Sequence, residues 1–339
     1  MAAVSREAER TEAGPSVAFW RDRTVLVTGA TGLLGSWLVR ALLGAGAHVV
    51  ALVLDADPQS ELVRRGDLGR VTVVSGGLED AAALDRAVVG HEVDTVFHLA
   101  AQTLVGPAQR SPLATLEANV RGTYMLLDVC RRHGDRLSRV VVASSDKAYG
   151  SSPDLPYTED TPLRGLNAYD VSKSCADMLT QAYQSSYGVP AVIARLGNIY
   201  GGGDLHWSRI VPGTIRSLLR QEAPVIRSDG TPVRDYIYVE DAVSAYLRLA
   251  EMATLPEVRG RAFNFSGQRA VSVLELVGAI RRLMGCEHIR PAVLGTAVGE
   301  IQDQYLSIER AAQVLGWAPR FDLDAGLTRT IGWYRDLLG

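Results

Sequence analysis

The sequence predicts an α/β protein built on a doubly wound parallel sheet. Short apolar runs alternate with longer helical segments over the first 200 residues. The runs are rich in β-branched residues and lack polar alternation, which is typical of strands buried on both faces of a parallel sheet. In chain order they are TVLVTGA (24–30), HVVALVLD (48–55), RVTVVSG (70–76), VDTVFHLAA (93–101), RVVVASS (139–145) and PAVIARLGNIYG (190–201).

Helical segments separate these runs. Two of the segments end at a glycine, Gly134 and Gly188, which is a common helix-ending residue. Strands that alternate with helices in this way predict parallel strand pairing with helices on both faces. The clearest segments are LLGSWLVRALLGAG (33–46), SPLATLEANVRGTYMLLDVCRRHG (111–134) and AYDVSKSCADMLTQAYQSSYG (168–188).

The alternation ends at about residue 200. Loop-rich stretches follow, with helical segments at 239–253, 272–285 and 324–338. The polar, charged start of the chain has no apolar run and predicts a disordered lead-in over residues 1–18. We therefore expect a first domain over residues 19–200 and a smaller, partly helical region over residues 201–339.

The composition excludes several classes of protein. A formal net charge of −3 argues against binding to nucleic acid or to an acidic membrane surface. The three cysteines, Cys130, Cys175 and Cys286, are too few and too widely spaced for a disulfide framework or a zinc site, and the histidines lack metal-ligand spacing. No metal is expected. No secretory signal or membrane-spanning run is visible, so we expect a cytoplasmic protein.

A glycine-rich turn follows the first predicted strand. Gly29, Gly32 and Gly35 are spaced G-x-x-G-x-x-G and stand where the strand ends and a helix begins. Glycines allow a tight turn and a close approach of the backbone, and a helix N-terminus offers free N–H groups to a pyrophosphate. In this context the motif predicts a dinucleotide site.

Tyr169 and Lys173 are four residues apart in a helical pattern, so their side chains share one face. With the glycine spacing and the elements HLAAQ (98–102), NVRGT (119–123) and GTPVRDYIYVEDA (230–242), the chain resembles the extended short-chain dehydrogenase/reductase superfamily. The resemblance implies a Rossmann-type domain that binds NAD. The implied NAD contacts are Gly29, Thr31, Gly32, Leu33, Leu34, Gly35, Asp55, Leu78, Leu99, Ala100, Ala101, Tyr169 and Lys173.

Two positions depart from the superfamily pattern. The acid that binds the adenosine ribose normally falls about where Val53 stands, and Asp55 lies two residues later. Gly77 replaces the aspartate of the usual G-D-L element. Asp55 still favours NAD over NADP, because a carboxylate accepts the 2′-hydroxyl and repels a 2′-phosphate. The alternative is that Asp55 is only a solvated loop acid.

The resemblance also assigns three residues to reversible oxidation at sugar C4. Tyr169 takes the hydroxyl proton, Lys173 lowers the tyrosine pKa and holds the ribose, and Ser145 hydrogen-bonds the sugar oxygen. The alternative is an amphipathic helix in which the Tyr and Lys are incidental. His98 is expected to orient the end of its strand and not to bind a metal.

Asp146 and Lys147, directly after Ser145, separate two reactions. Epimerases of this superfamily usually carry non-ionisable residues here, whereas the SSDKAYG element resembles CDP-glucose 4,6-dehydratases. In that reading Asp146 is the acid that protonates the departing C6 hydroxyl, and Lys147 is the base that removes the C5 proton. Burial moves the pKa of each group in the required direction, whereas a mutual ion pair opposes it. The alternatives are a structural ion pair, a 4-epimerase that needs only the other three residues, or a catalytically silent dinucleotide-binding protein.

The C-terminal region is expected to hold a nucleoside-diphosphate sugar. By resemblance Asn198 contacts the diphosphate, Ile210 and Val211 lie near the base, and Arg234 clamps phosphate. Arg209 and Gln304 are weaker candidates. The resemblance also implies a homodimer formed through the helices over about 112–133 and 169–187.

Overall fold

The computed structural model describes residues 16–339, except residues 56, 104–107, 109 and 298–299. Most of the lead-in predicted to be disordered, residues 1–18, lies outside the described residues. Its last three residues belong to the fold: Ser16 accepts a hydrogen bond from the Phe19 N–H and caps α1 (Val17–Trp20). Trp20 is fully buried, and its indole N–H donates to Glu251 at 3.0 Å.

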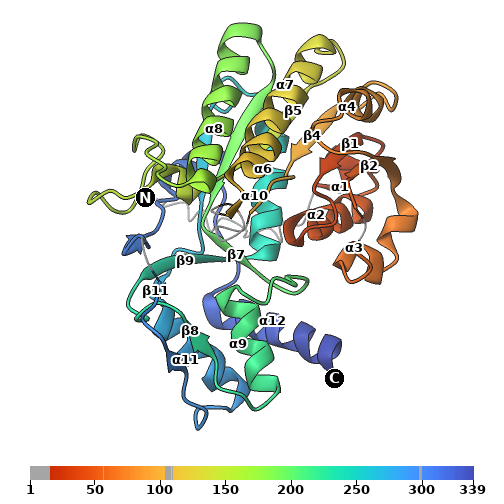
Figure 1. Ribbon diagram of the computed structural model, residues 1–339. Helices are drawn as coiled ribbons and strands as arrows, with labels where there is room; N and C mark the ends of the chain where they lie inside the picture. The colour runs from red at the N-terminus through yellow and green to blue at the C-terminus, as the bar shows by residue number, and fades with distance from the viewer. Residues whose placement is uncertain (1–15, 56, 104–107, 109, 298–299) are drawn as a thin grey trace, which may run out of the picture.

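The predicted doubly wound sheet is present as a seven-stranded sheet whose paired strands are all parallel, in the order β10-β6-β5-β4-β1-β2-β3 (Figure 1). Each predicted run contributes a strand of this sheet. The strands are β1 (Thr24–Thr28), β2 (His48–Val53), β3 (Thr72–Ser75), β4 (Thr95–His98), β5 (Arg139–Ser145), β6 (Ala191–Leu196) and β10 (Ala262–Phe265).

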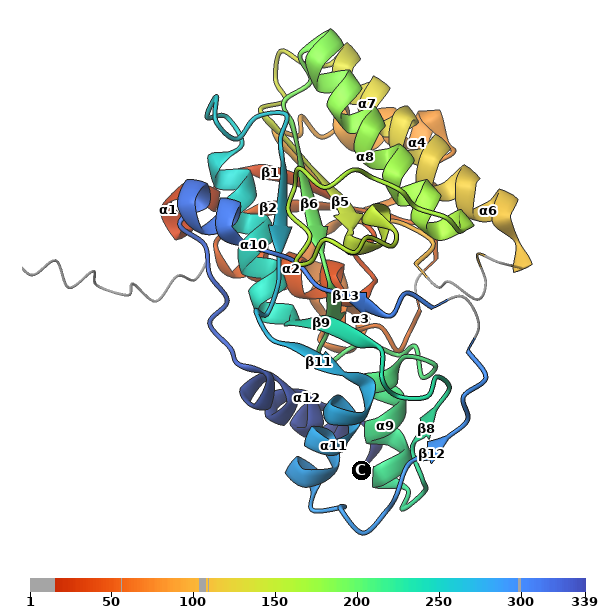
Figure 2. The same ribbon diagram turned by 90° about the vertical axis from the view of Figure 1, so that its left-hand side faces the viewer.

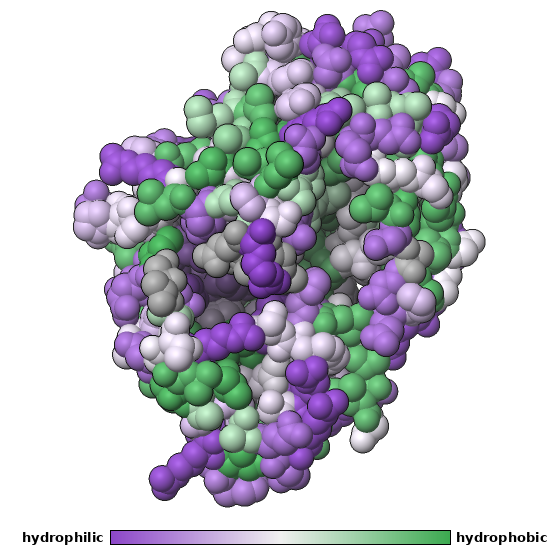
Figure 3. Space-filling model, viewed as in Figure 1, coloured by the Kyte–Doolittle hydropathy of each residue, from purple (hydrophilic) through white to green (hydrophobic). Residues whose placement is uncertain are grey.

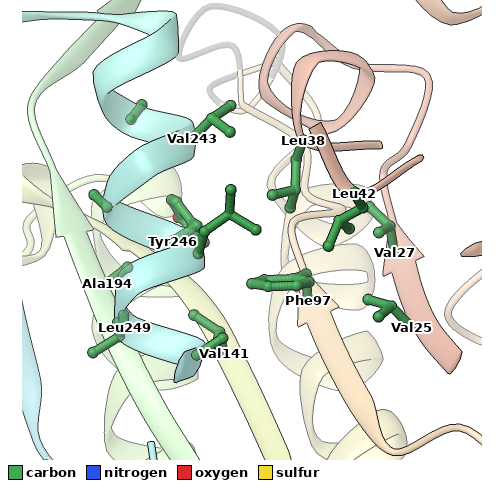
Figure 4. Packing of buried hydrophobic residues seen from close by; sticks show 14 of the residues in the cluster. Val25, Val27, Leu38, Leu42, Phe97, Val141, Ala194, Val243, Tyr246 and Leu249 are labelled. Atoms are coloured by element: carbon green, nitrogen blue, oxygen red, sulfur yellow. The ribbon is translucent and has the colours of Figure 1, made fainter. Parts of the chain in front are cut away.

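Both faces of the sheet are covered by helices, which explains the unbroken apolar runs. Val25 and Val27 of β1 join one core cluster and Leu26 joins the other, so alternate residues of one strand are buried on opposite faces. Figure 4 shows the first cluster, in which Phe97 lies between β1 and the helix that carries Tyr246.

The two helical layers lie on opposite sides of the sheet in Figure 2. One layer holds α1, α2 (Leu33–Gly44) and α10 (Val239–Met252). The other holds α4 (Ala81–Val88), α7 (Gly122–Arg132) and α8 (Ala168–Tyr187). Shorter helical turns connect the elements: α3 (Glu61–Arg64), η1 (Asp67–Arg70), α6 (Pro112–Leu116), η2 (Glu117–Arg121) and η3 (Asp146–Tyr149).

The C-terminal region has its own core beneath the large sheet. Strand β9 (Val233–Tyr238) is its centre and pairs with β7 (Asn198–Tyr200), β11 (Ala270–Ser272) and β13 (Asp303–Gln304). Figure 3 shows that the molecular surface is hollowed between this lower part and the large sheet above it. The remaining elements are α9 (Ile210–Leu219), β8 (Val225–Ile226), α11 (Val273–Met284), β12 (Ala292–Val293), η4 (Ala311–Leu315) and α12 (Leu323–Leu338).

A single boundary at residue 200 does not separate the two parts, because the chain returns to the first part after that residue. Helix α10 covers the large sheet and β10 is its outermost strand beside β6, although both follow residue 200. The predicted rhythm change is therefore real, but segments 239–252 and 262–265 return to the first part. Among the described residues, none of the helices combines the length and the hydropathy needed to cross a membrane.

Candidate active site

The glycine turn after β1 is fixed by close backbone contacts. Gly29 has φ +72°, and a Cβ there would lie 2.8 Å from the backbone nitrogen of Ala100. A Cβ on Gly35 would lie 2.0 Å from the carbonyl oxygen of Gly29. Gly32 caps α2 without any side-chain hydrogen bond, which leaves N–H groups of the first turn for a ligand. Only glycines allow this geometry, and the cradle fits the pyrophosphate of a dinucleotide.

The other predicted dinucleotide contacts lie at the same edge of the sheet. Leu33 and Leu34 begin α2, and Leu99, Ala100 and Ala101 follow β4. The carboxyl ends of parallel strands form the crevice where open α/β sheets bind ligands. Asp55 is exposed, two residues beyond the end of β2. Thr31 and Leu78, which follow β1 and β3, are partly buried and buried, respectively.

His98 ties this edge together, as its predicted orienting role requires. Its Nδ1 lies 2.9 Å from Thr28 Oγ1 and its Nε2 lies 3.0 Å from Thr123 Oγ1. The Thr123 hydroxyl donates to the Asn119 carbonyl, so His98 Nε2 must be the donor to Thr123. Burial, with a smaller effect of Lys173, lowers the His98 pKa to about 3, so this imidazole is neutral.

Asn119 is a positioning residue that the sequence did not single out. Its amide oxygen accepts the Gln102 N–H at 2.7 Å, and its amide nitrogen donates to the Gln102 carbonyl and to Ser172 Oγ. It lies in the π-helical turn η2, a geometry that is often found at functional sites. The NVRGT element contained this signal, since Asn119 joins the loop after β4 to α8.

The predicted oxidation residues come together at the end of β5 and the start of α8. Asn167 caps α8 through a hydrogen bond from the Asp170 N–H, which places Tyr169 and Lys173 in the first turns. Both side chains are buried, and Lys173 Nζ donates to the Ala143 carbonyl at 3.0 Å.

The electrostatics of Tyr169 differ from the expectation. Burial, together with the nearby charge of Asp146, raises its pKa to about 12. A hydrogen bond with Ser145 and the charge of Arg209 oppose this rise, and Lys173 is not among the causes. Burial also lowers the pKa of Lys173 to about 8. Ser145 and Arg209 are therefore the groups that favour the phenolate in the protein itself.

Asp146 and Lys147 form an ion pair within η3. Lys147 Nζ lies 3.7 Å from Asp146 Oδ2, which is beyond hydrogen-bond distance. Asp146 Oδ1 accepts the Ser145 hydroxyl at 2.9 Å, whereas its buried Oδ2 has no hydrogen-bond partner among the described residues. Lys147 Nζ instead donates to the amide oxygen of Gln304. Burial lowers the Lys147 pKa, Asp146 and Asp170 oppose this, and Arg234 supports it.

Two further buried carboxyl groups surround the pair, and the sequence did not point to them. Burial raises the pKa of Asp170 to about 6 against the opposing charge of Lys147, and its Oδ1 has no hydrogen-bond partner among the described residues. Burial also raises the pKa of Asp235 to about 6, and this carboxylate accepts the Leu306 N–H. Asp170 follows the catalytic tyrosine candidate directly in YDVSK, which is the signal that could have found it.

The predicted sugar-nucleotide contacts each have hydrogen-bond or packing partners within the protein. The guanidinium of Arg234 donates to the backbone carbonyls of Ile301, Gln302 and Val233. Arg209 is held by Asp204 and Thr103 at 3.1 and 3.0 Å. Asn198 donates to the Asp235 carbonyl, Ile210 is partly buried at the start of α9, and Val211 packs into the C-terminal core.

Comparisons with known proteins identify the family of the chain. Residues 25–264 match the model of the NAD dependent epimerase/dehydratase family. The chain is 34% identical over 319 residues to a dTDP-glucose 4,6-dehydratase of Mycolicibacterium smegmatis, covering 92% of this chain and 93% of the relative. It is 30% identical over 335 residues to a CDP-glucose 4,6-dehydratase of Salmonella typhimurium, covering 94% and 92%.

Among solved structures, a UDP-glucose 4-epimerase of Thermotoga maritima with UDP-glucose superimposes with a TM-score of 0.85. The sequence identity is 26%, over 93% of this chain and 100% of the epimerase. The family match and the glycine cradle agree on NAD as the cofactor. The chain belongs to the NAD-dependent epimerase/dehydratase family.

Proposed function

We propose that the protein is an NAD-dependent nucleoside-diphosphate-sugar 4,6-dehydratase of the CDP-glucose type. The observation that carries this proposal is the pair of the buried Asp146 and the partly buried Lys147 immediately after Ser145. A 4-epimerase needs no second acid and base beside its tyrosine. The names of two long relatives, a dTDP- and a CDP-glucose 4,6-dehydratase, support the reaction class.

The first half of the proposed reaction uses Ser145, Tyr169 and Lys173. Tyr169 removes the proton of the sugar C4 hydroxyl, and Ser145 holds the same oxygen by a hydrogen bond. The ammonium of Lys173, anchored on the Ala143 carbonyl, lies on the same face of α8. NAD, when bound, accepts the hydride from C4 and later returns it to C6.

The second half uses the acid–base pair. The C4 ketone acidifies the C5 proton, which Lys147 removes in its neutral form, and Asp146 protonates the departing C6 hydroxyl. Lys147 then returns a proton to C5. The sugar loses one water in total, Tyr169 gains a proton and Asp146 loses one, so solvent restores both. Burial lowers the Lys147 pKa, which supports this role over a structural ion pair, and the carboxylate of Asp146 at 3.7 Å acts in the opposite direction.

The choice of lysine at position 147 supports the same role. Lys147 and Lys173 are the only lysines in the sequence, although the chain holds 35 lysine and arginine residues. Arginine stays protonated at any physiological pH, whereas a buried lysine can lose its proton and act as a base. Every positively charged side chain outside the candidate site, histidines apart, is therefore an arginine, and both lysine amines lie in the candidate site.

The sugar nucleotide is proposed to lie between the two parts of the molecule, on Asn198, Arg209, Ile210, Val211 and Arg234. Permanent charge and planar geometry suit the two arginines to a diphosphate. The guanidinium of Arg234 donates to the backbone carbonyls of Ile301 and Gln302, and a diphosphate can replace these contacts. The CDP-glucose assignment rests on the Asp-Lys pair and on the Salmonella relative.

The second candidate is a nucleotide-sugar 4-epimerase. The fold of the Thermotoga epimerase and the Ser145–Tyr169–Lys173 arrangement favour it. In that reaction the 4-keto sugar turns over in the site and Asp146 and Lys147 have no chemical role.

We also propose the homodimer that the resemblance implies. Large apolar side chains are exposed along α6, α7 and α8, where Leu113, Tyr124, Met178 and Tyr187 are 70%, 39%, 61% and 62% exposed. Such a surface is typical of a covered interface. Light scattering should give twice the mass of the 36.5 kDa chain, and the monomer mass would refute the dimer.

A panel of nucleotide sugars tests the function. The purified protein is incubated with CDP-, dTDP-, UDP- and GDP-glucose, and the products are weighed by mass spectrometry. A product lighter by one water, formed fastest from CDP-glucose, is expected. An unchanged mass with altered stereochemistry would establish the epimerase instead.

A further inference from the structure

Gln304 joins the C-terminal region to the acid–base pair. Gln304 lies on β13, where it pairs with Arg234 of β9, and the Gln304 side chain is fully buried. Its amide nitrogen donates to the backbone carbonyl of Asp146 at 3.0 Å, and its amide oxygen accepts a hydrogen bond from Lys147 Nζ. One side-chain amide therefore binds both Asp146 and Lys147.

The orientation of this amide follows from its partners. A backbone carbonyl can only accept, so the NH₂ group must face Asp146, and the oxygen must face Lys147. The backbone around Gln304 is held on both sides. Strand β13 pairs with β9, and Tyr157 exchanges backbone hydrogen bonds with Tyr305 and Ser307 at 2.9 Å each. Gln304 therefore has little freedom to swing away from Lys147.

The charges that face Lys147 come from three elements. Asp146 lies beside it in η3, Asp170 faces it from α8, and Arg234 faces it from β9. Each carboxylate favours the ammonium form, and the guanidinium favours the neutral amine. Gln304 is the hydrogen-bond partner of Nζ and adds no charge. An amide oxygen can accept from either an NH₃⁺ or an NH₂ group and favours the ammonium form far less than a carboxylate in its place would.

We propose that Gln304 is a positioning residue that aims the Lys147 amine and, being uncharged, leaves it free to act as a base. This inference rests on the dehydratase function proposed above. It replaces the substrate contact that the sequence predicts for Gln304, because both polar ends of the amide are already bound within the protein.

Gln304→Glu tests the uncharged character at nearly constant side-chain size. A carboxylate in place of the neutral amide beside Lys147 should raise the apparent pKa of Lys147 by about one unit or more. The rising limb of the kcat–pH profile for dehydration should move upward by the same amount. Gln302→Glu is the matched control, since Gln302 is exposed two residues earlier and adds its charge at the surface.

Chemical acetylation measures the same shift of the Lys147 pKa without requiring catalytic turnover. With only Lys147 and Lys173 present, acetylation by limiting acetic anhydride and peptide mass mapping reports each amine as a function of pH. In Gln304→Glu the Lys147 curve should move upward while the Lys173 curve stays in place. Curves that overlay the wild type, in a variant that melts at the wild-type temperature, would overturn the proposal.

Gln304→Met tests whether Gln304 positions the Lys147 amine, and it keeps the proposal testable if the glutamate variant fails to fold. It keeps the volume but removes the acceptor, so kcat for dehydration should fall about ten- to a hundredfold with KM unchanged. A raised KM with wild-type kcat would assign Gln304 to substrate binding and refute the positioning role. If the wild-type protein forms no dehydrated product, the function fails first; the acetylation curves still test the Gln304–Lys147 coupling.

Discussion

The glycine turn and the Asp146–Lys147 pair both lie at carboxyl ends of strands in one sheet, but the protein holds them in different ways. The turn is held by backbone contacts, with Gly35 packed against the Gly29 carbonyl and Gly29 packed against Ala100. The pair is held by side chains, with Ser145 on one carboxylate oxygen and Gln304, from 157 residues further along the chain, on the amine.

The difference separates two kinds of requirement. The cofactor half needs a shape, which neutral backbone groups supply at any pH. The acid–base half needs two groups whose protonation states change during the reaction, so their neighbours must tune charge as well as place atoms. Changes in one half should therefore leave the other half measurably intact.

The largest effect is expected from Lys147→Met, which removes the base and keeps most of the side-chain volume. Dehydration should fall about a thousandfold, within the range for loss of an acid–base group, while NAD affinity stays unchanged. Product formation and an NAD titration measure the two halves separately. Ser144→Ala is the control, because the buried Ser144 hydroxyl has no hydrogen-bond partner among the described residues. A variant that keeps a tenth of the activity would disprove the base assignment.

The free energy of unfolding at acidic pH should show that the buried His98 in the cofactor half is neutral. The His98 pKa of about 3 lies below its ordinary value of 6.5, so the unfolded chain binds a proton between these values that the folded protein does not bind. Stability is unaffected above pH 6.5 and falls below it, by roughly 3 kcal/mol between pH 7 and pH 4.5.

His98→Asn lacks this loss, so its free energy of unfolding should converge with that of the wild type as the pH falls. Urea unfolding at both pH values measures the difference. The exposed His288 serves as the control, and His288→Asn should follow the wild-type curve. Wild-type and His98→Asn curves that stay parallel would show that His98 is not held neutral.

Gly35→Ala should damage the cofactor half through shape alone. The added methyl group would overlap the Gly29 carbonyl at 2.0 Å, and the typical cost of overpacking, about 1–3 kcal/mol, corresponds to a ten- to hundredfold loss of NAD affinity. Gly44→Ala is matched on the same helix, since a Cβ there meets nothing within 4 Å. Calorimetric NAD titration compares them, and equal affinities would refute the steric account.

The smallest effect is expected from Asp55→Asn. Asp55 is exposed, so loss of its hydrogen bond to the ribose should weaken NAD binding by about two- to tenfold and narrow the preference over NADP. Parallel titrations with both dinucleotides provide the measurement, with Asp57→Asn from the same loop as the control. An unchanged preference would mean that Asp55 is a solvated loop acid, and that another group selects the cofactor.

The two halves also differ in how far the sequence predicts them. The strand runs, the turn at Gly29–Gly35 and the Tyr169–Lys173 spacing are local patterns, and backbone sterics or helix geometry translate them directly into structure. The sheet order and the return of β10 beside β6 were not predictable, because they depend on packing between segments far apart in the chain.

The surroundings of the acid–base pair were predictable only in part. The sequence identified Asp146 and Lys147 but not Asp170 or the contact with Gln304, since no local pattern records which remote side chain will face a buried amine. The same limit explains Tyr169, whose pKa depends on burial, Asp146, Ser145 and Arg209 together. Charge environments are a property of the assembled fold.

Deuterium incorporation tests the central claim most directly. The wild-type protein is run with its nucleotide sugar in D₂O, and the product is weighed after reduction of its ketone with borohydride. Because Lys147 removes the C5 proton and returns one that has exchanged with solvent, the account predicts a sugar that has lost one water and carries one carbon-bound deuterium at C5. A product with the substrate's mass and no deuterium on carbon would contradict it.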